Sequence, residues 1–505
     1  MSNEQTPPGD SSLGGPLIRP PSDGPPIAKA EGSTEAERYL GRLAERSFLS
    51  LWTYPALFRD QGGGGASGGD GKELADLVVV FGRDVVVFSD KDCAFPNSGR
   101  LEIDWRRWFR AAVAGAAAQA WGAERWLRKY PDRIFLDRAC TRPFPFAIPS
   151  STEARYYRIV VAHATEERRR RAVSEGVEEC DAAGLLAVRP GLRGDPAHTV
   201  PFAIGDLDPA RGFVHVLDDV GFDALLSTLD TATDLLEYLR AREAFVRSDR
   251  LDEAASESAL LGDYHRRLDE RGANCFTDPG PGATVSIGAG EATAFSLSPE
   301  RRRQIEADRV SYAWDALIED FARDVLGGTL DYASRPQVGE HEPVFRHMAA
   351  EPRLRRRILG AAFQELRDDP ATGFHIRLVA PQDAPPPFRA GGEADEPWYL
   401  FLKIPRPFLL DETEYRRFRR ETLITHVFAV RHLHPNARNV IGIATEEGSP
   451  RERSYDAGLL DVEEWTPQLA AYAAEQYGLS LLRPTEGRRV VTHKFPPWTH
   501  SSGGT

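Results

Sequence analysis

The sharpest pattern of apolar and polar positions in this chain lies in residues 71–93. Two apolar runs rich in β-branched residues, 77–80 and 85–88, flank the tetrapeptide Phe-Gly-Arg-Asp at 81–84. Gly82 can supply the positive φ of a tight turn, so the pattern predicts a β-hairpin. With Gly82 and Arg83 as the turn residues, Asp76 pairs with Ser89 across the two strands.

The open end of this hairpin carries polar side chains. Because side chains alternate along a strand, Asp76, Ser89 and Lys91 are expected on one face, while Asp90 shares the other face with apolar residues. A carboxylate and an ammonium then meet at the end of an otherwise apolar hairpin. Carboxylates hold Mg²⁺ and a lysine can orient water, so the arrangement is typical of a hydrolytic metal site.

These residues resemble the PD-(D/E)xK superfamily of restriction-endonuclease-like nucleases. Asp76 matches the metal-binding aspartate of that family and Lys91 its lysine, while Ser89 stands where the second acid is expected, so the chain resembles a divergent member with Ser-Asp-Lys. Asp90 substitutes for that acid only if the strand slips or bulges by one residue. Glu73 substitutes only if the chain there leaves strict alternation. The resemblance covers residues 35–140.

Two helices supply further candidates. A helix is expected to begin after Ser33 or Thr34, and Glu37 lies at the edge of its apolar face. Members of the superfamily often carry a glutamate there, so Glu37 is the preferred candidate and Glu45 the reserve; an ordinary first-turn acid that favours the helix dipole is the alternative.

The second helix, expected over residues 105–130, carries Gln119 within an apolar stretch, where a buried amide needs a partner. RecB-type relatives carry a glutamine after the lysine strand, so Gln119 is a candidate to contact the site or a phosphate, against a purely structural hydrogen bond. Arg125 and Lys129 follow and could extend the same edge.

The resemblance implies a metal-dependent endonuclease that hydrolyses phosphodiester bonds, with restriction or antiphage defence as its context. Asp76, with Glu37 and Glu73, then coordinates Mg²⁺ or Mn²⁺, Lys91 positions the water, and Ser89 or Gln119 hydrogen-bonds within the site. Two alternatives remain open. The chain could be an inactive scaffold of nuclease fold that binds a protein or nucleic acid, or Asp76 and Lys91 could form only a salt bridge that closes the hairpin.

The rest of the pattern predicts an α/β fold in several parts, since 505 residues with 41% hydrophobic content can build more than one core. We expect a restriction-endonuclease-like mixed sheet flanked by helices, then a second α/β domain. The predicted parts are a disordered tail (1–32), a nuclease-like domain (33–165), an α/β extension packing on it (166–250), a linker (251–295) and a C-terminal recognition or assembly domain (296–500).

The elements expected beyond the hairpin follow from the same periodicities. Strands are expected at 134–136, 159–161, 213–216, 374–380, 398–404 and 440–445, and helices at 223–245, 298–328, 353–366, 411–433 and 467–477. A loop is expected over residues 61–71, which hold seven glycines.

Charge gives a mixed signal about partners. The net charge of −13 disfavours nucleic-acid binding, because phosphates are contacted by lysine and arginine. The arginines nevertheless cluster, and each cluster is either a solvated helix face or part of a local groove. The clusters are Arg168–Arg171, Arg301–Arg303, Arg353 with Arg355–Arg357, and Arg416, Arg417, Arg419 and Arg420.

Other classes of protein are disfavoured. No apolar run of membrane-spanning length and no leader is present, and the four cysteines show no zinc or disulfide spacing, so we expect a cytoplasmic protein without a membrane partner. The acidic groups at 206, 208, 218 and 219 are expected to be turn aspartates, and His163 a hydrogen-bonding residue at a strand end. The expected partners are nucleic acid, with DNA preferred to RNA, and a protein bound through the C-terminal domain.

Overall fold

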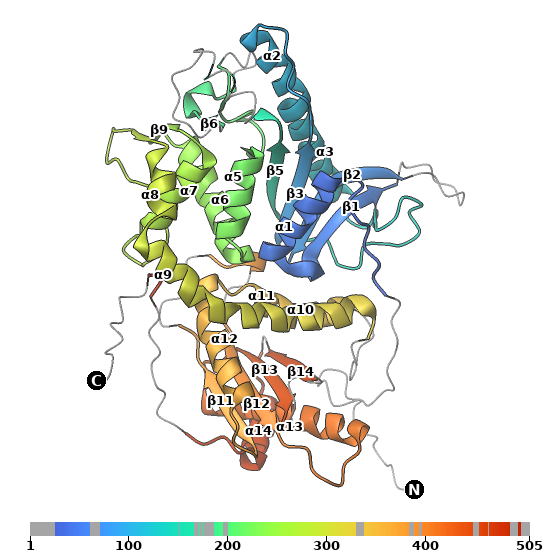
Figure 1. Ribbon diagram of the computed structural model, residues 1–505. Helices are drawn as coiled ribbons and strands as arrows, with labels where there is room; N and C mark the ends of the chain where they lie inside the picture. Colours follow the sequence, from blue (N-terminus) through green and yellow to red (C-terminus); the bar gives the residue numbers. More distant parts are fainter. Residues whose placement is uncertain are drawn as a thin grey trace.

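The computed structural model describes residues 26–60, 71–150, 152–165, 171, 174, 186–194, 200–329, 338–382, 388–392, 396–447, 454–462, 464–484 and 493–495. A six-stranded sheet with its helices occupies the upper part of Figure 1, and a four-stranded sheet occupies the lower part, with α10 and α11 between them. The chain therefore has the α/β architecture that the sequence predicts, with a second α/β unit after the first.

The six-stranded sheet has the strand order β4-β1-β2-β3-β5-β8. Strand β2 runs antiparallel to its neighbours β1 and β3, whereas β5 runs parallel to β3 and β8 runs parallel to β5. Its elements are α1 (Glu35–Trp52), β1 (Thr53–Arg59), β2 (Lys72–Phe81), β3 (Asp84–Lys91), α2 (Leu101–Trp108), a π-helical turn η1 (Phe109–Ala114), α3 (Gly115–Lys129), β4 (Ile134–Phe135), β5 (Arg155–Ala162) and β8 (Val214–Leu217).

The hairpin of β2 and β3 forms in the predicted register. Leu77 pairs with Phe88 and Phe81 with Asp84, and Gly82 has a φ of 55° in the turn. A side chain at Gly82 would meet the carbonyl oxygen of Gly391 at 2.4 Å, so the turn needs glycine for close approach as well as for conformation. The Arg83 N–H donates to that same oxygen at 3.0 Å, which ties the turn to the C-terminal part of the chain.

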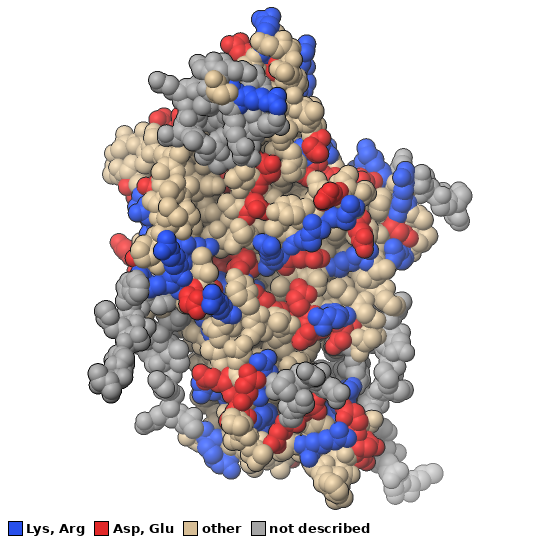
Figure 2. Space-filling view, viewed as in Figure 1, with Lys and Arg blue, Asp and Glu red and all other residues tan. Residues whose placement is uncertain are grey.

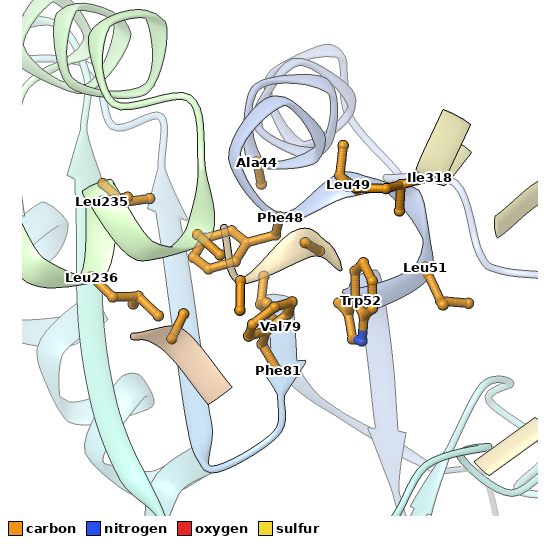
Figure 3. Packing of buried hydrophobic residues seen from close by; sticks show 14 of the residues in the cluster. Ala44, Phe48, Leu49, Leu51, Trp52, Val79, Phe81, Leu235, Leu236 and Ile318 are labelled. Atoms are coloured by element: carbon orange, nitrogen blue, oxygen red, sulfur yellow. The ribbon is translucent and has the colours of Figure 1, made fainter. Parts of the chain in front are cut away.

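The two faces of the hairpin enter different cores. Leu77, Val79 and Phe81 pack with α1 on one face, and Val78 and Val80 pack with α3 on the other. Figure 3 shows the first core, where side chains of α1 and β2 meet side chains of α6 and α10. This core continues into the C-terminal sheet, so the two sheets are joined by one apolar interior.

The middle of the chain packs beside this sheet. Its helices are α5 (Asp219–Thr228), α6 (Ala232–Arg247), α7 (Glu257–Arg266), α8 (Gly290–Ser296) and α9 (Pro299–Asp308), with short 3₁₀ turns η2 (Pro190–Leu192) and η3 (Arg309–Ser311). A small sheet of order β10-β9-β6-β7 contains β6 (Ala187–Val188), β7 (Ala203–Ile204), β9 (Leu251–Ala254) and β10 (Val285–Ile287).

The C-terminal sheet has the order β11-β12-β13-β14, with β12 and β13 parallel and both edge strands antiparallel. Its elements are α10 (Tyr312–Gly327), α11 (Val338–Ala349), α12 (Arg353–Asp368), β11 (His375–Val379), η4 (Ala390–Gly392), β12 (Trp398–Ile404), α13 (Glu412–Leu433), β13 (Asn439–Glu446), β14 (Tyr455–Asp461) and α14 (Pro467–Leu479). Strand β12 has the predicted bounds. Helix α13 begins one residue after the predicted start, because Asp411 caps it by accepting a hydrogen bond from Glu414 N–H.

The prediction of a linker at 251–295 is wrong. Strands β9 and β10 pair in parallel there, and α7 packs against both. Phe276, expected in the linker, stacks on Phe245 with ring centroids 4.5 Å apart. Because the segment is polar and its strands are short, its local sequence pattern does not predict these elements. Packing against α6 accounts for them instead.

The predicted helix at 223–245 is two helices. Asp218 caps α5 by accepting from Gly221 N–H, and Thr231 caps α6 by accepting from Asp234 N–H. The continuous apolar pattern conceals the break because both helices bury their apolar faces in the same core.

Three further expectations differ from the structure. Strand β1 was missed, because Thr53–Arg59 follows α1 without a turn signal, and β14 was missed at the opposite end of the chain. Residues 1–25 of the predicted tail lie outside the described residues, as do 61–70 of the predicted loop. Residues 26–32 are not disordered: the Ile27 N–H donates to the Leu326 carbonyl at 2.8 Å, and Lys29 donates to the Thr53 carbonyl at 2.9 Å.

The arginine cluster of α12 is not a solvated face. Arg353, Arg356 and Arg357 are all buried, and their carboxylate partners lie on other elements. Arg356 pairs with Asp315 at 2.5 Å and Arg357 with Asp308 at 2.6 Å. The cluster therefore joins helices instead of forming a groove.

The cluster on α13 is divided. Arg416 is half-buried and Arg417 is exposed, and each pairs with a glutamate one turn away. Arg419 is buried against Asp456 of β14, in contrast to the solvated face that the sequence suggested. Of the Arg168–Arg171 cluster, only Arg171 lies within the described residues.

Surface charges of opposite sign are interspersed. On the face shown in Figure 2, basic and acidic side chains alternate over the middle and lower parts of the molecule rather than gathering by sign. None of the helices in the described ranges is both long and apolar enough to cross a bilayer.

Candidate functional site

The candidate site lies at the open end of the β2–β3 hairpin and is built around Asp76. This carboxylate is buried, with 7% of the residue exposed. Its Oδ2 accepts from the Asp90 backbone N–H at 2.6 Å and lies 3.6 Å from Lys91 Nζ. The hairpin register sets these contacts, because it brings the start of β2 opposite the end of β3.

Ser89 and Lys91 contact Asp76 from the same face, as the alternation predicts. Ser89 is fully buried, and its Oγ donates to Asp76 Oδ2 at 3.3 Å. Lys91 is more open, with 30% of its side chain exposed. Lys91 can therefore reach a ligand from solvent, whereas Ser89 can only orient Asp76.

Gln119 reaches the site from α3. Its Nε2 donates to Asp76 Oδ1 at 3.4 Å and its Oε1 accepts from Ser89 Oγ at 3.4 Å. Helix α3 lies on this face because Ala120, Ala123 and Leu127 pack on the hairpin. Gln119 thus contacts both Asp76 and Ser89. These contacts provide the hydrogen-bond partners that a glutamine on an apolar helix needs.

The site carries uncompensated negative charge. Burial raises the pKa of Asp76, Lys91 lowers it in part, and the charge of Glu37 raises it further. Burial, then Asp76 and Glu37, raise the pKa of Glu73. The acidic neighbours of Asp76 and Glu73 thus disfavour the ionised forms of these two carboxyl groups, and a bound cation would relieve this repulsion.

Glu73 reaches this face through an irregularity in β2. Leu57 of β1 pairs with Ala75, but the next residue, Phe58, pairs with Glu73, so the register shifts by one residue. Strict alternation is broken at this point, which was the condition for Glu73 to take part. Its side chain lines the same cavity as Gln119.

Glu37 has a structural task as well. It completes a capping box at the start of α1, where its Oε2 accepts from Ser33 N–H at 2.6 Å and its N–H donates to Thr34 Oγ1 at 3.1 Å. Glu45, the reserve candidate, is not at the site: burial raises its pKa, and its charged neighbours are Lys29 and Glu319.

Asp90 lies on the opposite face, so it does not replace the missing acid. The strand does not slip, because β3 pairs regularly with β5 through Lys91. The Asp90 carboxylate contacts His163 Nε2 at 2.5 Å, and Asp219 Oδ2 lies 4.0 Å from the other ring nitrogen. Asp90 serves the site only through its backbone N–H.

The two carboxylates of Asp219 and Asp90 raise the pKa of His163 to about 10 from an ordinary value of 6.5. A group whose pKa is raised on folding contributes stability that is complete below its unfolded pKa and is lost as pH rises toward the folded value. We therefore expect His163→Gln to lower the melting temperature most below pH 6.5, and less as pH approaches about 10. The test is thermal unfolding of the wild type and His163→Gln in EDTA at pH values across this range. A difference in melting temperature that does not change with pH would contradict the ion pairing of His163.

The remaining acidic candidates have structural roles. Asp218 caps α5, Asp206 pairs with Arg247 at 2.8 Å, and Asp208 pairs with Arg211 at 3.0 Å. In the part of the chain that the structure describes, no three His, Cys, Asp or Glu side chains converge as a ready-made metal site.

The carboxylate oxygens of Asp76, Glu73 and Glu37 are the type of ligand that a hard cation such as Mg²⁺ prefers. This set of ligands is not preassembled. Asp76 is already hydrogen-bonded, so an ion would have to draw Glu73 or Glu37 toward it.

Sequence reasoning missed the triad of Asp90, His163 and Asp219. His163 was considered alone, and the parallel pairing of β3 with β5 brings it beside Asp90. It also missed Arg59 and Lys72 at the facing ends of β1 and β2, which line a cavity with Gln119. The positive residues around residues 61–71 were the available signal for that cavity.

Comparison with known proteins gives no further guide, since the chain matches no protein-family model, no curated protein and no solved structure.

Proposed function

We propose that this protein is a metal-dependent nuclease that hydrolyses phosphodiester bonds of nucleic acid. One observation carries the proposal: a buried aspartate meets a partly exposed lysine at the open end of a hairpin, and a glutamine from α3 contacts the aspartate. Resemblance to PD-(D/E)xK nucleases gives this arrangement its chemical interpretation.

In this proposal Asp76, with Glu73 and Glu37, would hold Mg²⁺ or Mn²⁺. The ion would supply a Lewis acid for a phosphodiester oxygen and would lower the pKa of a bound water. Lys91 orients the attacking water. It also offsets the negative charge that develops on the phosphorane oxygens as the water oxygen bonds to phosphorus and the bond to the leaving oxygen breaks. Ser89 and Gln119 hold the Asp76 carboxylate in one orientation.

The test is incubation of the purified protein with supercoiled plasmid, linear duplex, single-stranded DNA and RNA, each with Mg²⁺, Mn²⁺ or EDTA. We expect cleavage of at least one substrate with a divalent ion and none with EDTA, because hydrolysis needs the Lewis acid. Cleavage that persists in EDTA would contradict the metal-dependent mechanism.

A second candidate function is an inactive scaffold of this fold that binds nucleic acid. It is favoured by Ser89 in place of the second acid and by the lack of a preassembled ligand group in the described residues. Calorimetric titration with Mn²⁺ separates the two. A nuclease shows binding that Asp76→Ala removes, whereas the scaffold shows the same heats with and without Asp76.

A further inference from the structure

A cavity of about 660 Å³ opens beside the candidate site, between α3 and the facing ends of β1 and β2. Four cationic side chains line it: Arg59 from β1, Lys72 from β2, and Arg125 and Lys129 from α3. Lys72, Arg125 and Lys129 are exposed, while Arg59 is partly buried.

These four cations lack carboxylate partners among the described residues. Their sequence neighbours differ in this respect: Arg128 pairs with Glu124 at 2.8 Å, and Arg133 pairs with Asp60 at 2.5 Å. In a protein with a net charge of −13, four such charges around one cavity favour an anionic ligand there.

Aromatic rings hold two of the cations in place of carboxylates. The Arg59 guanidinium lies over the Trp126 ring at 4.5 Å, and Lys129 Nζ lies over the Tyr130 ring at 5.1 Å. A cation held by a ring keeps its N–H donors and its charge for a ligand, unlike a cation neutralised by a carboxylate. The pairing of Trp126 and Tyr130, with ring centroids 4.6 Å apart, also gives the cavity an aromatic wall.

Gln119 connects this cavity to the candidate site. It lines the cavity and donates to Asp76 Oδ1 at 3.4 Å, and Glu73 lines the cavity as well. A chain of phosphates along the four cations would therefore pass Gln119, the cavity residue that contacts Asp76.

We propose that this cavity binds the backbone of single-stranded nucleic acid and delivers it to Asp76. Cationic side chains that follow a backbone, with aromatic rings beside them, are the usual means of binding single strands. A cavity of this size admits a base and its phosphate from one strand, whereas a duplex keeps its bases stacked inside. The delivery to Asp76 rests on the proposed function; the binding of the strand does not.

The probe is a fluorescein-labelled oligothymidylate of about 12 nucleotides, and its oligouridylate and duplex counterparts, followed by fluorescence anisotropy in EDTA. The triple variant Lys72→Gln, Arg125→Gln, Lys129→Gln is expected to bind the single strand about tenfold or more weakly. It should also lower the slope of log K against log salt by about 2, since each lost contact with a single strand removes about 0.7.

The matched control removes three charges elsewhere, in Arg406→Gln, Arg416→Gln, Arg417→Gln. All three are surface arginines paired with glutamates, and we expect a change in affinity below about twofold. Circular dichroism confirms that both triple variants fold.

The outcomes separate the two proposals. Equal loss in both triple variants, no binding by the wild type at low salt, or tighter binding of the duplex would each overturn the cavity as a single-strand site. Binding that depends on the cavity cations in a protein that cleaves nothing would keep the cavity and reject the nuclease. Cleavage with unchanged binding in the cavity variant would do the reverse.

Discussion

Replacing Asp76 with asparagine is expected to lower the rate of phosphodiester cleavage by about a thousandfold or more, while the protein stays folded. The change removes the one carboxylate that contacts Lys91, Gln119 and the backbone of β3. Asparagine has nearly the same shape, so the loss reports the charge and its ligand oxygens. The measurement is the single-turnover rate on the substrate that the wild type cleaves.

The stability of Asp76→Asn is expected to be unchanged or higher, although its activity falls. Burial raises the pKa of Asp76, which means that the fold disfavours its charge. The melting temperature of Asp76→Asn in EDTA should thus equal or exceed that of the wild type. Asp208→Asn, which removes a surface carboxylate paired with Arg211, serves as the matched control and should keep full activity. Wild-type cleavage by Asp76→Asn would reject the assignment of the site.

The second large effect concerns the buried ion pairs of α12. Asp315 of α10 accepts from Arg353 at 2.7 Å and from Arg356 at 2.5 Å, and Arg353 also contacts Asp230 at 2.9 Å. Asp315→Ala leaves two buried guanidinium groups short of a partner. We expect the free energy of unfolding to fall by about 3–5 kcal/mol, because an unpaired buried charge is far costlier than the pair is favourable.

Urea unfolding followed by tryptophan fluorescence measures this effect, with Trp314 on the same helix as a probe. Asp320→Ala is the matched control on α10: its partner Arg323 is exposed, so the loss should stay below about 1 kcal/mol. The double variant Asp315→Leu, Arg356→Met should recover part of the stability, since it removes the unpaired charge together with its partner. Similar losses in Asp315→Ala and Asp320→Ala would show that the network is not a buried unit.

Elements defined by local patterns were predictable. The hairpin register follows from its turn, because a two-residue turn with Gly82 leaves only one pairing that buries both apolar runs. The helix ends at Asp411 and Ser298 follow from capping residues, each of which accepts from a backbone N–H three residues ahead. The face shared by Asp76, Ser89 and Lys91 was also predictable, because the alternation of side chains along a strand depends only on neighbouring residues.

Contacts between distant elements were not predictable. The arginines of α12 looked like a solvated cluster, because Asp315 and Asp230 lie 38 and 123 residues away from Arg353. Helical spacing favoured Glu37 over Glu45, but only packing decides which side of α1 faces the hairpin. The polar segment at 251–295 became ordered because α6 and its neighbours offered an apolar surface to a few residues.

The sequence by itself determined the hairpin, the face shared by Asp76, Ser89 and Lys91, and the helices with clear caps, because each depends on residues within one or two turns of chain. Only the tertiary structure decided that Gln119 completes the contacts of Asp76, that Asp90 belongs to His163, and that four cations meet beside the site. These three contacts depend on the order of strands in the sheet and on which face of the sheet α3 covers. Both features are fixed by the burial of apolar side chains from the whole chain, not by any local segment.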